Sequence, residues 1–202
     1  MSKILQPGKR YTFSDYFDLN YPTREIVAEF GYTYRLEEVV FPTPETAIAP
    51  LDRLRQLSRQ KLPLISLTSE IAKREFYIAP LLLELLDYIR AEIDVEYPID
   101  AGENLSGTID YFLRSRDNFI IIEAKKGDLE KGFNQLAIEL IAVVLSFRIE
   151  SPLYGAVTLG DVWRFGVLDP VTKTLTKDLN AYALLSDLEA IVGILVGVLE
   201  TK

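Results

Sequence analysis

Three charged residues carry the clearest chemical signal in this sequence: Asp110, Glu123 and Lys125. Asp110 lies in a predicted strand over residues 108–114, and Glu123 lies in the next predicted strand, over residues 119–124. The midpoint between Asp110 and Glu123 falls within the turn that joins these strands. Residues equidistant from a tight turn face one another across an antiparallel pair and point to the same side. We therefore expect the two carboxylates to lie close together, with Lys125 on the same face of the sheet.

Converging carboxylates repel each other unless a cation lies nearby or the pKa of one group rises. Lys125 offsets part of this charge, and a divalent cation held by Asp110, Glu123 and the backbone carbonyl of Ala124 would offset the rest. Such an ion polarises phosphoryl oxygens and helps to generate hydroxide from water, while Lys125 could orient that water or stabilise charge on the phosphate. The pattern thus contains the parts needed for phosphodiester hydrolysis. The same residues could instead form a structural salt-bridge cluster at a strand edge.

The composition restricts the remaining chemistry. Of the 202 residues, 49% are apolar and 26% are charged, as in globular proteins, and neither cysteine nor histidine is present. Disulfides, zinc sites built from cysteine or histidine, and catalysis by histidine are therefore excluded, and a bound metal must be held by oxygen. The net charge of −8 counts against a general affinity for nucleic acid. The first residues lack the apolar segment of a signal peptide, so we expect a cytoplasmic protein.

Two segments of different character position these residues. Residues 1–65 form an N-terminal extension that is interrupted by prolines and that we expect to pack on the core, whereas residues 66–202 form the main domain. In the extension we predict helices over 14–19, 22–30 and 51–61 and a strand over 32–40. In the main domain we predict helices over 70–90, 129–147 and 186–199, and strands over 93–100, 108–114, 119–124, 153–159 and 162–168. This order indicates an α/β fold in which a mixed β-sheet is flanked by helices.

Local signals mark several element boundaries. Ser69 is a predicted N-cap for the helix over 70–90, and Pro80 predicts a kink or break inside that helix. Ser186 and Glu189 resemble a capping box at the start of the last helix. Trp163 lies in an alternating strand, where we expect it to belong to the core and not to a platform for stacking nucleic acid bases.

The spacing of the three charged residues resembles that of a known nuclease family. Asp110 is followed after twelve residues by Glu123-x-Lys125 on an apolar strand, as in the PD-(D/E)XK nuclease superfamily, which has a restriction-endonuclease-like core. The superfamily core runs helix, three-stranded meander, helix, strand, and residues 70–159 match that order. The stretch 122–126 particularly resembles the nuclease domain at the N-terminus of type I restriction subunits. Ile109 replaces the proline of the signature, which is a common variation.

The resemblance implies a set of roles at the site. Asp110 and Glu123, with the carbonyl of Ala124, would bind Mg²⁺ or Mn²⁺, and Lys125 would position the attacking water. An acid on the first core helix joins the metal site in several branches, and Glu70 is the first candidate, with Glu75 the second. A glutamine on the second core helix occurs in some branches, and Gln135 is similar in position. Glu70 could instead only favour the helix dipole, and Gln135 could only contact Glu139, four residues on.

The resemblance leaves two functional hypotheses open. The first is an Mg²⁺-dependent nuclease that hydrolyses DNA. The second is an inactive nuclease fold that acts as a homo-oligomeric interaction module, which the acidic composition favours. The apolar strand over 162–168 and the apolar helix over 186–199 extend beyond the core that the fold needs, so we expect them to pack on the N-terminal segment or on a second copy of the chain in a homodimer. Basic side chains around the mouth of the site would support DNA binding, whereas a scattered arrangement would not; the residues concerned are Arg53, Arg55, Arg59, Lys61, Lys73 and Arg74.

Overall fold

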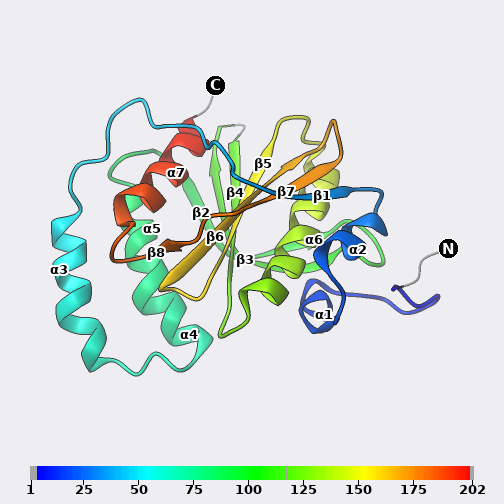
Figure 1. Cartoon of the computed structure of the whole chain (residues 1–202), viewed down its shortest axis with the longest axis horizontal. Helices are drawn as coiled ribbons and strands as arrows, with labels where there is room; N and C mark the ends of the chain where they lie inside the picture. Colours follow the sequence, from blue (N-terminus) through cyan, green and yellow to red (C-terminus); the bar gives the residue numbers. More distant parts are fainter. Residues whose placement is uncertain (1–3, 117, 201–202) are drawn as a thin grey trace.

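A mixed eight-stranded β-sheet forms the centre of the computed structural model, which describes residues 4–116 and 118–200. The strand order is β1-β7-β6-β5-β4-β3-β2, and the short strand β8 pairs with β6. The strands are β1 (Thr33–Glu37), β2 (Glu92–Asp100), β3 (Ser106–Ser115), β4 (Asn118–Ala124), β5 (Leu153–Thr158), β6 (Val162–Asp169), β7 (Thr174–Asp178) and β8 (Tyr182–Ala183). Helices cover both faces of this sheet (Figure 1), so the predicted α/β class with a mixed sheet is confirmed.

Seven α-helices occur in the described residues, together with two short helical turns. They are α1 (Phe13–Asp18), α2 (Thr23–Ala28), α3 (Asp52–Lys61), α4 (Glu70–Lys73), α5 (Ala79–Leu85), α6 (Leu129–Phe147) and α7 (Leu188–Glu200). A 3₁₀ turn, Leu62–Leu64, follows α3, and a π-helical turn, Arg74–Ile78, joins α4 to α5. None of the helices within residues 4–116 and 118–200 is long and apolar enough to cross a membrane.

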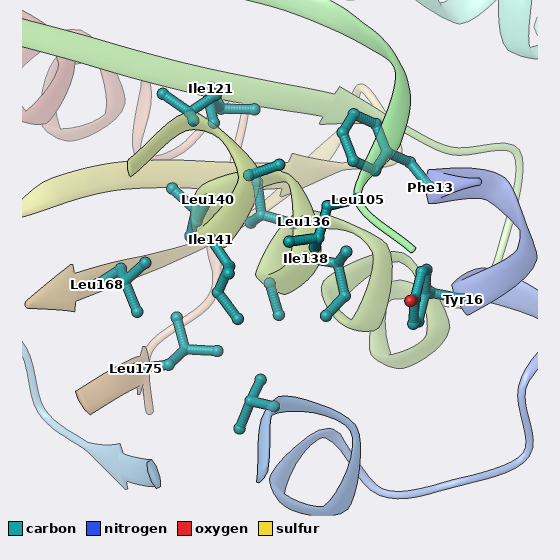
Figure 2. Close-up of a cluster of buried hydrophobic side chains, with 14 of the residues drawn as sticks. Phe13, Tyr16, Leu105, Ile121, Leu136, Ile138, Leu140, Ile141, Leu168 and Leu175 are labelled. Carbon is teal, nitrogen blue, oxygen red and sulfur yellow. The ribbon is translucent and has the colours of Figure 1, made fainter. Parts of the chain in front are cut away.

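Two hydrophobic layers fix the sheet between the helices. On one face, α6 lies between the sheet and the N-terminal helices α1 and α2 (Figure 1). Residues 132–144 of α6 are all buried, because the sheet covers one side of this helix and α1 and α2 cover the other. Figure 2 shows this layer, in which Leu136 and Leu140 of α6 lie near Ile121 of β4. On the other face, α3, α5 and α7 enclose a second apolar cluster.

Strand pairing places β4 in the interior of the sheet. β4 pairs antiparallel with β3 and parallel with β5, and α6 forms the connection between β4 and β5. The run Ile120, Ile121 and Ile122 is buried on both faces, as expected for a central strand between two helical layers. The site residues at the end of β4 are therefore held by a rigid part of the molecule.

The predicted elements before the sheet core agree with the structure apart from one helix. The predicted helix over 70–90 is divided into α4, the π turn and α5, so its interruption begins at Arg74, before Pro80 itself. Ser69 does cap α4, because its hydroxyl oxygen accepts a hydrogen bond from the backbone N–H of Ala72. The predicted turn at 116–118 contains Asp117, which lies outside the described residues.

In the C-terminal third, one predicted feature is wrong and two strands were not predicted from the sequence. The predicted capping box is wrong: the Ser186 hydroxyl contacts the Ala183 carbonyl and Asp187, and the Glu189 carboxylate accepts from Leu51 and Arg55. The helix α7 begins at Leu188. The strands β7 and β8 were not predicted, and β7 joins the sheet to the N-terminal strand β1.

The apolar surfaces of β6 and α7 are covered within the chain. Trp163 of β6 is fully buried and donates from its indole nitrogen to the Gly160 carbonyl, which confirms that it belongs to the core. The helix α7 packs on β4, α5 and β8, and Gly197 lies against the backbone at Pro42. The surface proposed for the homodimer thus has partners in the same chain, and the homodimer itself stays a prediction.

Candidate functional site

The register of the β3–β4 hairpin brings Asp110 opposite Glu123. Tyr111 pairs with Ile122, the last pair of the ladder, and the next position along both strands is Asp110 with Glu123. At this point the backbone N–H of Ala124 donates a hydrogen bond of 2.8 Å to Oδ2 of Asp110. The predicted juxtaposition of the two acids is thus present, at the place where β3 and β4 stop pairing.

Asp110 lies in a mainly buried position beside a cation. Its Oδ1 atom is 3.3 Å from Nη1 of Arg74, and both side chains are only 15% exposed. Burial raises the pKa of Asp110 above its usual value, and the Ala124 N–H and the charges of Arg74 and Lys125 act in the opposite direction. The carboxyl group is therefore held by one backbone donor and one side-chain cation.

Glu123 is almost fully enclosed, with 1% of its surface exposed. Its Oε1 atom lies 2.5 Å from Nζ of Lys125 and accepts a hydrogen bond of 2.7 Å from Nε2 of Gln135. Burial, and then the nearby charge of Glu139, raise the pKa of Glu123 well above its usual value. The Lys125 ammonium is the group that most directly favours the ionised form.

Glu139 is a third carboxyl group of this cluster, and the sequence indicated it only as a contact of Gln135. It is fully buried in α6, and its Oε1 accepts a hydrogen bond of 2.9 Å from the same Nε2 atom of Gln135 that binds Glu123. Burial raises the pKa of Glu139 to about 7, and the hydrogen bond from Gln135 acts in the opposite direction. The two glutamates therefore form a buried pair in which one proton is retained near neutral pH.

Lys125 remains charged at this site despite its burial. Its side chain is 13% exposed, and its Nζ lies 5.3 Å from the centre of the Phe17 ring of α1. Burial by itself lowers the pKa of Lys125, but the charge and hydrogen bond of Glu123 outweigh it, so the pKa is raised. Lys125 therefore supplies a fixed positive charge next to Glu123, at the edge of the α6 layer.

Glu70 and Glu75, the two candidate acids of the first core helix, act on different residues of the site. The negative charge of Glu70 raises the pKa of both Asp110 and Lys125, which places it near these groups. Glu70 is also the first residue of α4, where an acid favours the helix dipole, so both predicted roles fit its position. Glu75 is exposed, and its charge acts on Tyr111. Glu70 is thus the better placed of the two candidates.

Two members of the cluster were missed as site residues, Arg74 and Glu139. Glu139 is the one charged residue among the otherwise apolar and buried positions 136–144, and that isolation was the signal that could have identified it. Arg74 follows Glu70 by one helical turn, so it reaches the same edge of the sheet. The sequence indicated Arg74 only as one of six basic residues that could lie around the mouth of the site. Its contact with Asp110 depends on tertiary packing.

The basic residues whose positions test the DNA-binding hypothesis lie in different parts of the structure. Lys73 and Arg74 lie at the site, and Nζ of Lys73 donates to the Lys126 carbonyl just after β4. Arg55 of α3 instead pairs with Glu189 of α7, on the far side of the second apolar cluster. Local positive charge is therefore present beside Asp110, although Arg55 does not contribute to it.

The chemistry of the buried oxygens fits a hard divalent cation. Oε2 of Glu123, Oε2 of Glu139 and Oε1 of Gln135 are buried and have no hydrogen-bond partner. Unpartnered buried oxygens of this kind are costly unless a proton or cation satisfies them. Within residues 4–116 and 118–200, no three acidic side chains are arranged to hold a metal ion. A cation here would therefore use two carboxylates and complete its shell with carbonyl oxygen and water, as Mg²⁺ commonly does.

One apolar groove in the described part of the chain lies away from this cluster. It has a volume of about 730 Å³ and is lined mainly by residues that flank the 3₁₀ turn, the π turn and β8, including Leu62, Pro63, Tyr77, Val162 and Leu184. None of the cluster carboxylates lines it. The convergence of ionisable side chains, and not the size of a cavity, identifies the candidate site.

Comparison of the sequence with models of protein families and with curated proteins finds no match. The candidate site therefore stands on its own geometry, and the family resemblance of its motif remains an inference from the residues themselves.

Proposed function

We propose that this chain is a nuclease that requires Mg²⁺ or Mn²⁺ and hydrolyses phosphodiester bonds of DNA, with a restriction-endonuclease-like core of the PD-(D/E)XK type. The observation that carries the proposal is the hairpin register, which sets Asp110 opposite Glu123 and joins Asp110 to the backbone of Ala124. The order α4–α5, β2–β3–β4, α6, β5 agrees with the core of that superfamily. Fold order and site position thus support the same function.

The metal ligands in this proposal are Asp110, Glu123 and the carbonyl oxygen of Ala124. A bound Mg²⁺ or Mn²⁺ would supply Lewis acidity toward a phosphate oxygen and would lower the pKa of a water molecule. Gln135 fixes the orientation of Glu123 through its 2.7 Å hydrogen bond. Glu70, near Asp110, assists from the first core helix.

Lys125 is the proposed group that acts on water or phosphate. Its ammonium has no lone pair and cannot bind a cation, but it can donate to a water or to an anionic oxygen. Glu123 and the Phe17 ring hold it at the edge of the cluster, so its charge is in place before substrate binds. Fixed charges of this kind stabilise the negative charge that develops on a phosphate during hydrolysis.

Local charge supports a polyanionic substrate even though the whole chain is acidic. Three cations, Lys73, Arg74 and Lys125, lie around the cluster, and the exposed Lys126 follows directly. Binding of a phosphate backbone depends on such local charge more than on the net charge of −8.

One observation favours the second hypothesis, an inactive fold that serves as a homo-oligomeric module. Arg74 and Lys125 already pair with Asp110 and Glu123, so the cluster is largely neutralised by the protein itself. In that case the ion pairs would only stabilise the end of the hairpin, and assembly of the chain would be its function.

Metal binding and DNA cleavage, measured together, distinguish these functions. We expect calorimetry to detect Mn²⁺ binding by the wild-type protein and its loss in Asp110→Asn, which keeps an acceptor for the Ala124 N–H. The matched control is Asp100→Asn, at the exposed end of β2. Cleavage of single-stranded, double-stranded or branched DNA should require Asp110. Absence of both Mn²⁺ binding and cleavage, with light scattering that shows an oligomer, would favour the interaction module.

A further inference from the structure

Arg74 lies between acids of two neighbouring strands. Its Nη1 atom is 3.2 Å from Oε1 of Glu96 on β2 and 3.3 Å from Oδ1 of Asp110 on β3. The guanidinium carbon is 5.2 Å from the centre of the Tyr111 ring, and the Tyr111 hydroxyl donates to the Arg74 carbonyl. Arg74 is the first residue of the π turn, an irregularity that often occurs at functional sites.

The backbone of β2 is distorted where it meets this arginine. Glu96 lies between the pairs Val95–Tyr111 and Tyr97–Ile109, which is the position opposite Asp110. It has a positive φ of 56°, a conformation that costs energy in a residue with a side chain. Its carboxylate is 66% exposed and still contacts Arg74. The chain thus keeps a strained residue at the position where it provides Arg74 with a second acidic partner.

The position of Arg74 conflicts with a cation at Asp110. Oδ2 of Asp110 accepts the Ala124 N–H, so Oδ1, the oxygen beside Arg74, is the one not used by the backbone. A divalent cation bound through Asp110 would be repelled by a guanidinium 3.3 Å from that atom. Arg74 can leave Asp110 without losing all its acidic contacts, because Glu96 remains. Lys125, by contrast, is enclosed with Glu123.

We propose that Arg74 is a substrate-binding residue, which leaves Asp110 when a divalent cation binds and then donates to a phosphate oxygen of the nucleic acid. This inference rests on the proposed function, and it adds a residue that the sequence motif does not contain. Both ion pairs of Arg74 use Nη1, so neither occupies Nη2 or Nε. The side chains of Arg74 and Tyr111 also share a hydrogen bond, and neither ion pair uses the Nε–Nη2 edge with which arginine binds phosphate.

Two variants and a matched control test the proposal through binding. Arg74→Gln removes the charge, and Arg74→Lys keeps it without the planar fork. Arg10→Gln is the control, because Arg10 also pairs at 3.3 Å with an acid of β2, Asp100, in an exposed position. Mn²⁺ affinity is measured by calorimetry without DNA. The affinity for a fluorescein-labelled DNA duplex is then measured by anisotropy in Mn²⁺, with each variant in a Lys125→Met background that is expected not to cleave.

Opposite changes in the two affinities are the expected result. Arg74→Gln should bind Mn²⁺ several-fold more tightly, because a repelling charge is gone, and should bind the duplex about tenfold to a hundredfold more weakly, as for loss of a hydrogen bond to a charged group. Arg74→Lys should recover part of the duplex affinity, and the Arg10→Gln control should change neither. Unchanged duplex affinity in Arg74→Gln would overturn the proposal, since Arg74 would then only neutralise Asp110.

The proposed function can fail separately from this inference. Wild-type protein that binds Mn²⁺ and DNA through Arg74 but cleaves no DNA would refute the nuclease and retain the phosphate-binding role. Wild-type protein that cleaves DNA, with the half-saturating DNA concentration unchanged in Arg74→Gln, would refute the role of Arg74 and retain the nuclease. Thermal unfolding of each variant at the assay pH shows whether the change in affinity occurs in folded protein.

Discussion

The buried carboxyl groups of Glu123 and Glu139 are joined through a single amide nitrogen. Nε2 of Gln135 donates to Oε1 of Glu123 at 2.7 Å and to Oε1 of Glu139 at 2.9 Å. Their other oxygens are buried without a partner. Because a charged pair of acids in such a place is unfavourable, the pair holds a proton more tightly in the folded chain than in the unfolded chain.

Glu139→Gln should change how stability depends on pH. The pKa of Glu139 rises from 4.5 to about 7 on folding, so its stabilising contribution is complete below pH 4.5 and is lost as the pH rises through 7. This difference corresponds to a free energy on the order of 3 kcal/mol. Glutamine mimics the protonated acid, so the variant should lose less stability between pH 5 and pH 8. Urea denaturation at both pH values measures this, with exposed Glu103→Gln as control. Parallel changes in the variant and wild type would contradict it.

The hairpin at the site could be predicted from the sequence because a tight turn determines the register of its strands. Asp110 and Glu123 are equidistant from that turn, and this symmetry required no knowledge of tertiary structure. The limits of α6 were likewise predictable as 129–147, since its apolar residues recur at helical spacing, and the structure adds Asp128 as the N-cap. The sequence could not show that Gln135 bridges two acids, because this contact depends on how deeply α6 is buried in the structure.

The missed strand β7 shows why the remainder was not predictable. Lys177 and Asp178 are charged, which is typical of an exposed segment, but both are buried in the structure. Lys177 pairs with Glu130 of α6, and Asp178 accepts hydrogen bonds from the Val39 N–H and the Tyr182 hydroxyl. Glu130 and Val39 are distant from β7 in sequence, so composition and periodicity within β7 contain no trace of these contacts. The contact between Arg74 and Asp110 was missed for the same reason.

Two glycines of α7 should respond oppositely to the same substitution. A methyl group at Gly197 would overlap the Pro42 carbonyl, whereas one at Gly193 would meet only Ile48 at 3.8 Å. Gly197→Ala should therefore destabilise the protein by about 1–3 kcal/mol through overpacking. Gly193→Ala should stabilise it by about 0.5–1 kcal/mol, because alanine favours the helix. Chemical denaturation measures both, and equal effects would show that α7 does not pack closely on this segment.

Two serines test which helix start is capped by a side chain. Ser69→Ala should cost about 1 kcal/mol, because it removes the acceptor for the Ala72 N–H at the start of α4. Ser186→Ala should change stability by less than about 0.5 kcal/mol, since the Ser186 hydroxyl donates weakly, at 3.4 Å, to the Ala183 carbonyl. Denaturation curves of the two variants give the comparison. A larger cost at Ser186 would restore the capping box that the structure contradicts.

Lys125→Met should separate metal binding from catalysis. Methionine retains much of the apolar stem beside Phe17 but removes the charge, so Mn²⁺ affinity should stay the same or increase. DNA cleavage should fall by a factor on the order of 10²–10³, the usual effect of removing a key electrostatic donor. Calorimetry and single-turnover cleavage measure the two effects. The control is Lys126→Met, at the exposed next position, which should cleave at a rate close to wild type.

The same variant also tests whether Lys125 has only a structural role. Without the Lys125 ammonium, the buried Glu123 loses the cation that favours its ionised form. The pKa of Glu123, which burial and Glu139 already raise, should therefore rise further. In the metal-free protein, folding would then favour a proton on Glu123, so the loss of thermal stability measured without metal should be greater at pH 8 than at pH 5. A purely structural lysine predicts this pH-dependent loss of stability together with wild-type cleavage. A catalytic lysine predicts the same loss of stability with cleavage strongly reduced even at temperatures where the variant is folded.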